Sequence, residues 1–128
     1  MDERAGEIAL RELLGTATVA ELTLKVRLQL APEDTISAAA ALMRNRSHGC
    51  ALVCRDDRLV GIFTERDLLY AIHDGLDLSR PLADVMTADP QTIHGSDSLW
   101  EAMRLMDTGG YRRLPVVDAD GSPVGIVD

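Results

Sequence analysis

The feature that most constrains how this chain folds is an internal repeat. At an offset of 63 residues, capping, apolar and turn positions in the first half meet identical residues in the second half: Ala20 and Ala83, Asp34 and Asp97, Ala39 and Ala102, Met43 and Met106, Val53 and Val116, Asp57 and Asp120. After a turn that is longer by one residue, Val60-Gly61-Ile62 meets Val124-Gly125-Ile126 at an offset of 64. Because self-similarity at a fixed period marks repeated structural units, the sequence predicts two copies of a unit of about 60 residues.

Each copy has the pattern strand, helix, strand, strand, helix. In the first copy, the alternation from Val26 to Leu30 predicts a strand, and Pro32-Glu33-Asp34 opens a helix with Asp34 as its N-cap. The equivalent helices of the two copies carry apolar stripes with helical spacing: Ile36, Ala39, Ala40 and Met43 in the first, and Leu99, Ala102, Met103 and Met106 in the second. Two strands and a helix complete the first copy: Cys50 to Cys54, the strand around Gly61, and the helix from Thr64 to about His73.

This pattern predicts the architecture. A unit of this kind buries only one face of its sheet, so the two copies are expected to pack sheet against sheet about a pseudo-two-fold axis. The fold class is therefore α/β (α+β), with each small sheet flanked by helices. We expect an N-terminal helical extension over residues 1–18, the first repeat over 19–76 and the second over 77–128. The strand-to-helix junctions would face a shared cleft, where small ligands usually bind.

Composition limits the classes of partner. The 128 residues carry a net charge of −8, which argues against nucleic acid or an anionic membrane as the main partner. Aromatic residues, at 3%, are too few for a base-stacking platform. No apolar run approaches the length of a membrane span, and the start Met1-Asp2-Glu3-Arg4 is unlike a signal peptide. We therefore expect a cytoplasmic protein.

The sequence contains no motif typical of catalysis or metal binding. Cys50 and Cys54 are expected about 13 Å apart on one strand, which is too far for a disulfide, so we expect reduced thiols. The three histidines share no metal-ligand spacing with one another or with the cysteines. Phosphate-loop, nucleophile-elbow and dinucleotide motifs are also missing. We therefore predict neither an enzyme, nor a metal site, nor a required cofactor.

The candidate site is the stretch Gly61-Ile62-Phe63-Thr64-Glu65-Arg66-Asp67, where a buried strand runs into a helix. A helix N-terminus carries free N–H groups and partial positive charge, so it is a natural seat for an anion. Thr64 and Asp67 also have the spacing of an ordinary capping box, so the residues alone leave both interpretations open. Several arginines are candidates for a local basic patch that would favour an anion: Arg44, Arg46, Arg66, Arg112 and Arg113.

Three segments together resemble a tandem pair of cystathionine β-synthase (CBS) domains, also called a Bateman module. They are the junction Gly61–Asp67, the opening Asp84-Val85-Met86-Thr87 of the second repeat, and Leu114-Pro115-Val116-Val117-Asp118. The resemblance covers Val19 to Asp128. In that family the pattern Gly-hydrophobic-x-Thr/Ser-x-x-Asp/Asn marks an adenine-nucleotide site.

The resemblance implies roles for individual residues. Thr64 would hydrogen-bond a phosphate, and Asp67 would accept hydrogen bonds from the ribose hydroxyls. Arg112 and Arg113 precede Leu-Pro-Val, where family members often present basic groups to phosphates, and Arg66 is a further phosphate-binding candidate. The purine would lie between aliphatic groups, for which we choose Leu24, Val26 and Ala51.

The sequence departs from the family pattern in both repeats. The first has Ala51-Leu52-Val53 where the family often has Leu-Pro-Val. The second stops at Asp128, before the expected ribose carboxylate and closing helix, so we expect the natural chain to continue. Asp128 also stands where Thr or Ser is expected, and an aspartate would repel phosphate. We therefore expect one nucleotide per chain, bound at the first repeat.

The expected function is that of a regulatory module that binds an adenine nucleotide or a related adenosyl ligand and passes the signal to an effector protein. AMP, ADP and ATP are the ligands expected first, with S-adenosylmethionine and NAD as related possibilities. The alternative is a dimerisation or protein-docking module with no physiological nucleotide. We expect a symmetric homodimer with Met43, Met103, Met106 and Tyr70 divided between core and interface, although all four would also fit an intrachain core.

Overall fold

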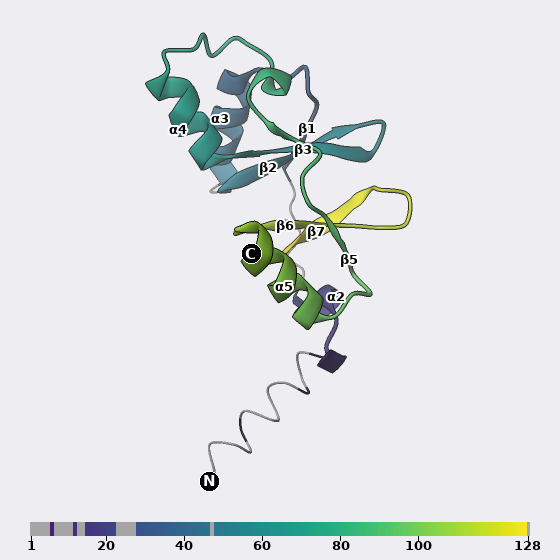
Figure 1. Cartoon of the computed structure of the whole chain (residues 1–128). Coiled ribbons are helices and arrows are strands. Elements are labelled where there is room, and N and C mark those ends of the chain that lie inside the picture. The colour runs from purple at the N-terminus through teal and green to yellow at the C-terminus, as the bar shows by residue number, and fades with distance from the viewer. Residues whose placement is uncertain (1–5, 7–11, 13–14, 23–27, 47, 128) are drawn as a thin grey trace. The chain divides into compact units, whose positions relative to one another are not determined.

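The computed structural model describes residues 6, 12, 15–22, 28–46 and 48–127, and the structural statements below concern these residues (Figure 1). Most of the helix expected from Glu3 to Leu14 lies outside the described residues and remains a prediction. Of the strand expected from Val26 to Leu30, the first two residues lie outside them, and Gln29–Leu30 forms a strand as predicted.

The described elements follow the order that the repeat predicts. In chain order they are α2 (Val19–Leu22), β1 (Gln29–Leu30), α3 (Ile36–Arg46), β2 (Cys50–Arg55), β3 (Arg58–Thr64), α4 (Glu65–His73), the 3₁₀ turn η1 (Leu82–Asp84), β4 (Thr87–Ala88), β5 (Ile93–His94), α5 (Leu99–Gly109), β6 (Leu114–Val117) and β7 (Pro123–Val127).

The strands form two separate small sheets. One has the order β1-β2-β3-β4 and the other the order β5-β6-β7. The parallel pairs β1–β2 and β5–β6 have the same register, because Leu30 lies opposite Val53 and Ile93 lies opposite Val116. Four consecutive residues of β2, Cys50–Val53, and all four of β6 are buried, as expected for apolar strands covered on both faces. The predicted mixed α/β class, with small sheets flanked by helices, is confirmed.

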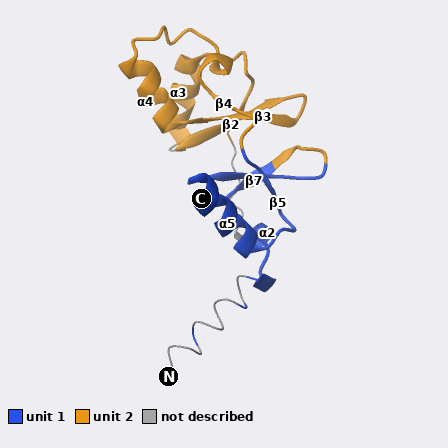
Figure 2. Cartoon of the chain, viewed as in Figure 1, with its two compact units in different colours: residues 1–25, 91–119, 124–128 blue, residues 26–90, 120–123 orange. Residues whose placement is uncertain are grey.

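The chain forms two compact units that do not coincide with the two sequence repeats (Figure 2). Unit 1 comprises residues 1–25, 91–119 and 124–128, and unit 2 comprises residues 26–90 and 120–123. Each unit has its own apolar core. The core of unit 2 consists of Leu28, Ile36, Ala39, Met43, Ala51, Val53, Phe63, Ala71 and Leu82, and that of unit 1 consists of Val19, Ile93, Ala102, Leu114, Val116 and Val127.

The cap of helix α3 differs from the prediction. Asp34 is not the N-cap, because its Oδ2 accepts a hydrogen bond from the Ala31 N–H at 2.8 Å and so closes the preceding turn. The Thr35 hydroxyl accepts from the Ala38 N–H at 3.0 Å and caps the helix instead. Either side chain can perform this function, and the register of the preceding turn decides between them. The second repeat has the same arrangement at Asp97 and Ser98.

The apolar stripe of α5 is narrower than predicted. Leu99 and Ala102 are buried and Met106 is half-buried, but 51% of the Met103 surface is exposed. In α3 the corresponding stripe is buried at Ile36 and Met43. The difference shows that the interpretation of Met43, Met103 and Met106 as intrachain core residues does not hold for Met103.

The Met86 side chain lies so close to the backbone of Gly61 that no side chain fits at this position. A Cβ atom added to Gly61 would lie 2.5 Å from Met86 Sδ and 3.1 Å from Met86 Cε. Gly61 lies opposite Ala88 in the antiparallel pair β3–β4, so the opening segment of the second repeat lies alongside β3. Two of the segments that resemble the CBS pattern are thus in direct contact, which the sequence alone did not indicate.

We expect Gly61→Ala to lower the free energy of unfolding by about 1–3 kcal/mol, because the added methyl group overpacks the core against Met86. Met86→Ala in the same chain should relieve the clash, so the double variant should be less destabilised than the sum of the single variants. Urea denaturation of the four proteins measures this coupling.

Gly95→Ala is the matched control. A Cβ at Gly95 would make only an ordinary contact, 3.5 Å from the Ala20 Cβ, so this change should be neutral or slightly stabilising. If the changes in free energy of unfolding caused by Gly61→Ala and Met86→Ala simply add in the double variant, the proposed contact is contradicted.

Candidate functional site

The junction between β3 and α4 forms a complete capping box. Thr64 is the N-cap, with φ −113° and ψ 167°. Its Oγ1 accepts a hydrogen bond from the Asp67 N–H at 3.2 Å, and Asp67 Oδ2 accepts one from the Thr64 N–H at 2.9 Å. The Thr-x-x-Asp spacing therefore has the structural role that the sequence left open. Both side chains are half-buried and held in defined positions.

The capping box does not use all of the hydrogen-bonding capacity of these two side chains. In the cap, the Thr64 hydroxyl acts only as an acceptor, so its proton remains able to donate to a phosphate oxygen. The second carboxylate oxygen of Asp67, Oδ1, has no partner in the described part of the chain and can accept from a hydroxyl. The structural and the ligand-binding interpretations of Thr64 and Asp67 are therefore compatible.

The backbone at the start of α4 is less open to an anion than the sequence suggests. The Glu65 N–H donates to the Gly49 carbonyl at 3.1 Å, and the Asp67 N–H is used by the cap. An anion at this end would therefore depend more on side chains than on backbone donors. Arg66, whose side chain is exposed, is the nearest cation in sequence, and Glu65 beside it carries the opposite charge. The involvement of Gly49 was not predicted, and no local pattern indicates it.

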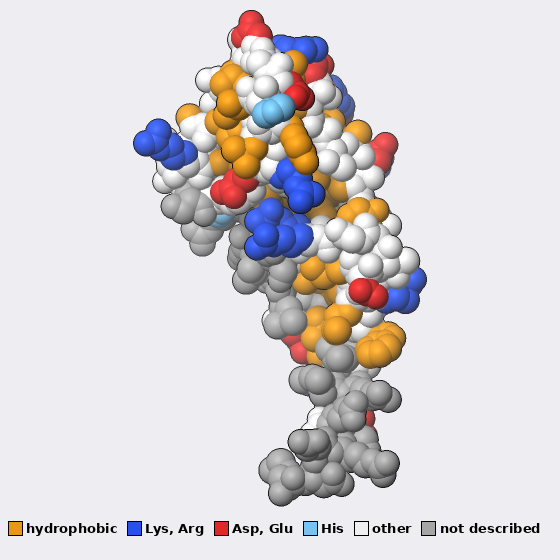
Figure 3. All heavy atoms as spheres, turned by 60° about the vertical axis from the view of Figure 1, so that its left-hand side comes forward, with side chains coloured by type: hydrophobic (Ala, Val, Ile, Leu, Met, Phe, Trp, Pro, Cys, Tyr) orange, Lys and Arg blue, Asp and Glu red, His pale blue; other side chains and the backbone are white. Residues whose placement is uncertain are grey.

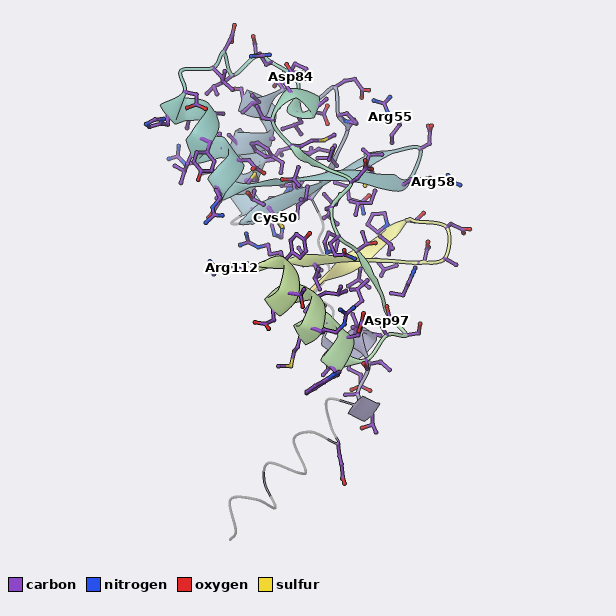
Figure 4. The ribbon with its side chains drawn as sticks, in the orientation of Figure 1. Cys50, Arg55, Arg58, Asp84, Asp97 and Arg112 are labelled. Atoms are coloured by element: carbon purple, nitrogen blue, oxygen red, sulfur yellow. The ribbon has the colours of Figure 1, made fainter. Side chains whose placement is uncertain are left out.

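The other predicted phosphate-binding residues belong to the other unit. Arg112 and Arg113 precede β6 in unit 1, with Arg112 exposed and Arg113 half-buried (Figure 4). Thr64, Arg66 and Asp67 lie in unit 2. Within unit 2 the structure thus brings together the first-repeat candidates around one helix start.

The structure describes only one of the three residues predicted to contact the purine, Ala51. Ala51 lies opposite Phe63 in the β2–β3 pair, and no part of it is exposed. It belongs to the core of unit 2, so its side chain is not offered to a ligand. Leu24 and Val26 lie outside the described residues, and their proposed role stays a prediction.

Comparison with known proteins identifies the family. The model of the CBS domain matches residues 19–74 and 82–128, which is most of the chain. The chain belongs to the CBS domain family. It is 35% identical over 103 residues to the CBS domain-containing protein CBSCBSPB1 of Arabidopsis thaliana, covering 79% of this chain. This CBS pair spans only 19% of the length of that relative.

Solved structures of CBS-pair proteins share the fold. CBSX2 of Arabidopsis thaliana, in complex with AMP, has a TM-score of 0.77 and 29% identity, covering 87% of this chain and 89% of CBSX2. The CBS domain protein PAE2072 of Pyrobaculum aerophilum, complexed with AMP, has a TM-score of 0.80 and 26% identity, covering 87% and 86%. These likenesses confirm the predicted tandem CBS pair.

The corresponding junction of the second CBS repeat is described only in part. Strand β7 ends at Val127, with Gly125 buried as its counterpart Gly61 is. Asp128, the counterpart of Thr64 in the sequence repeat, lies outside the described residues. The predicted weakness of a second site therefore rests on the sequence alone.

Three further features bear on the chemistry of the CBS pair, each in the described part alone: side chains that could bind a metal, reactive thiols and membrane-spanning helices. No group of three or more His, Cys, Asp or Glu side chains there is arranged to hold a metal ion. Neither Cys50 nor Cys54 forms a disulfide. Burial, followed by the nearby Asp57 carboxylate, raises the pKa of the Cys54 thiol. That thiol therefore stays protonated and weakly reactive at neutral pH. Among the described helices none has the length and apolarity needed to cross a membrane.

We expect Asp67→Ala to lower the free energy of unfolding by about 1 kcal/mol, because the change removes one half of the capping box. Asp67→Asn should lower it much less, since the amide oxygen can still accept from the Thr64 N–H. Thermal and urea denaturation measure both variants. Equal destabilisation by Asn and Ala would contradict the assigned role of Oδ2.

Proposed function

We propose that this CBS pair is a regulatory module that binds an adenine nucleotide at the start of α4. The observation that carries the proposal is the capping box, which orients Thr64 and Asp67 and leaves the Thr64 hydroxyl proton and Asp67 Oδ1 for a ligand. A hydroxyl donor and a carboxylate acceptor one helical turn apart suit a phosphate and a ribose diol, respectively. The AMP bound by CBSX2 and by PAE2072 supports this choice of ligand class.

In this proposal each charged residue has a separate role. Asp67 Oδ1 accepts from the ribose hydroxyls, and the Thr64 hydroxyl donates to the phosphate. Arg66 supplies positive charge that the protein as a whole, at −8, does not provide. The phosphate-binding role of Arg112 and Arg113 stays a prediction from the sequence. We place AMP first, and we keep ADP, ATP, S-adenosylmethionine and NAD as ligands for the binding assay. The module would act in the cytoplasm, through an effector protein that reads the ligand-bound state.

The test of the site is the affinity of Asp67→Asn. This change keeps the cap but replaces the free carboxylate oxygen with an amide N–H₂ group and removes the charge. Affinity for AMP should fall roughly ten- to a hundredfold, the value of a charge-assisted hydrogen bond. Isothermal titration calorimetry measures the affinity, and it also gives the stoichiometry, for which we expect one nucleotide per chain.

Asp34→Asn is the matched control, because Asp34 also uses Oδ2 to accept a backbone N–H in unit 2 but lies outside the proposed site. It should leave AMP affinity unchanged. If Asp67→Asn binds every tested nucleotide as tightly as the parent protein, the proposed site is wrong, and Thr64 and Asp67 act only as a helix cap.

The second candidate function is a dimerisation or docking module, which the exposed apolar side chains favour. On α4, Leu69, Tyr70 and Ile72 are exposed by 66%, 60% and 55%. On α5, Trp100 and Met103 are exposed by 55% and 51%. Hydrophobic side chains gather on the upper part of the surface that faces the viewer in Figure 3, where the side carrying α4 is turned forward. Such groups on a protein surface often mark protein interfaces.

We propose that these helix faces join two copies of the chain in a symmetric homodimer. Of the four residues that the sequence assigned to core or interface, Met43 is 4% exposed and Met106 is half-buried, which leaves Tyr70 and Met103 as the interface candidates. The dimer is compatible with nucleotide binding. If the chain bound no nucleotide, a dimer would support the docking function instead.

Sedimentation at about tens of micromolar, where weak dimers begin to form, should show the parent chain as a dimer. Tyr70→Glu should shift it toward the monomer, because a charge would be buried at the interface. Gln91→Glu adds the same charge at an exposed position in a loop, and it should leave the chain a dimer. A monomeric parent chain would contradict the proposed dimer.

A further inference from the structure

The thioether of Met86 lies directly against the backbone of Gly61 in unit 2. The three atoms nearest to the Cβ position of Gly61 all belong to Met86: Sδ at 2.5 Å, and Cγ and Cε at 3.1 Å each. Gly61 is buried in β3, whereas Met86 is half-buried and packs on the edge of the unit 2 core. Strand β3 therefore covers one side of this sulfur, while part of the residue remains exposed.

The distances show which side of the thioether the strand covers. The Cβ position of Gly61 is equally far from the two carbons bonded to the sulfur and is closest to the sulfur itself. A point beyond the sulfur, in the plane of the three atoms, would lie clearly farther from both carbons. The backbone of Gly61 therefore lies over one of the two faces of the thioether. An oxidant can add oxygen from either face, and each face gives a different sulfoxide epimer.

The backbone on both sides of this contact is held in place. The Met86 N–H donates to the Leu82 carbonyl at 2.8 Å. Further along the chain, the Asp89 N–H donates to the Val60 carbonyl at 3.1 Å, next to the β3–β4 pair. Because the segment is fixed before and after β4, the Met86 side chain has little freedom to turn its covered face outward.

We propose that Met86 is a site of oxidation by peroxides, and that the Gly61 backbone directs the oxygen to the opposite face of the sulfur. The sulfur attacks one oxygen of hydrogen peroxide, the O–O bond breaks, an S–O bond forms, and the second oxygen leaves as water. The sulfur loses two electrons and the peroxide gains them. The product at Met86 is a single sulfoxide epimer, and this reaction does not depend on the proposed nucleotide site.

Oxidation at this position weakens the packing of β4 against β3. A sulfoxide is polar, and a polar group placed against apolar side chains without a hydrogen-bond donor is destabilising. The cluster on which Met86 packs consists entirely of apolar residues. The change is also reversible, because methionine sulfoxide reductases A and B each act on one epimer. One of the two enzymes is therefore sufficient to restore the Met86 side chain.

Peroxide treatment of the full native chain, followed by peptide mass spectrometry, measures the oxidation of each methionine. Met86 should be oxidised more slowly than Met103, which is 51% exposed, and faster than Met43, which is 4% exposed. Each reductase is then applied to the digested peptides. One reductase should repair about tenfold more of the oxidised Met86 than the other, whereas the two should repair similar fractions of Met103. Equal repair of Met86 by both, or no oxidation of Met86 once Met103 has reacted completely, would overturn the proposal.

Hydrogen exchange of the β3 amides measures the structural effect. In the oxidised chain the slowest of these amides should exchange about tenfold faster, as expected for a polar group in apolar surroundings. Met86→Leu cannot form a sulfoxide and should lose this response to peroxide. Met103→Leu is the matched control and should retain it. Unchanged exchange in β3 after complete oxidation of Met86, or an unchanged response in Met86→Leu, would contradict the proposed effect.

Gly61→Ala tests the shielding of the sulfur directly. The added methyl group displaces the thioether from β3, so Met86 should be oxidised faster and should give both epimers. Gly95→Ala adds a methyl group in ordinary contact with the Ala20 Cβ, at 3.5 Å, and should leave the epimer ratio unchanged. Retention of a single epimer in Gly61→Ala would overturn the role of Gly61. If this variant does not fold, the epimer ratio in the parent chain decides the proposal by itself.

Discussion

The rest of the structure depends on the fact that neither repeat holds all the residues of its own core. Leu82 completes the core around Phe63, and Val19 completes the core around Val116. A small sheet with one helix layer buries too little apolar surface to tolerate a missing large side chain. The packing of Leu82 into this core also explains why the opening of the second repeat lies along β3. There Met86 occupies the space left by the missing side chain of Gly61.

The junction after Gly61 shows how one local motif can serve both the fold and a ligand. Thr64 and Asp67 satisfy backbone groups at the start of α4, and this fixes both side chains before any ligand arrives. A hydroxyl and a carboxylate each have more hydrogen-bonding capacity than the cap requires. Preorganisation of this kind reduces the entropy that binding would otherwise cost. A ligand site can therefore coincide with an ordinary helix cap.

In the proposed function, this module acts through what it binds and what it contacts. The exposed apolar residues of α4 lie on the same helix whose first turn carries Thr64 and Asp67. A ligand at that end and a partner on the outer face would thus act on a single rigid element. If the position or order of α4 differs between the ligand-bound and partner-bound states, the ligand would change the affinity of the protein for the partner. By thermodynamic linkage, the partner would then change the affinity for the ligand by the same factor.

The sequence by itself determined the repeat, the order of the elements, the capped helix start at Thr64 and the family, because each depends on residues close together in the chain or on a strict offset. Only the tertiary structure decided which unit receives each opening segment, that Ala51 is buried, that Met103 is exposed and that Thr35 replaces Asp34 as the cap. The first three outcomes depend on contacts between residues far apart in sequence, whereas the choice of cap depends on the turn from Ala31 to Asp34. Two equivalent segments with nearly the same local pattern carry no signal of which partner they pack against, so packing alone makes the choice.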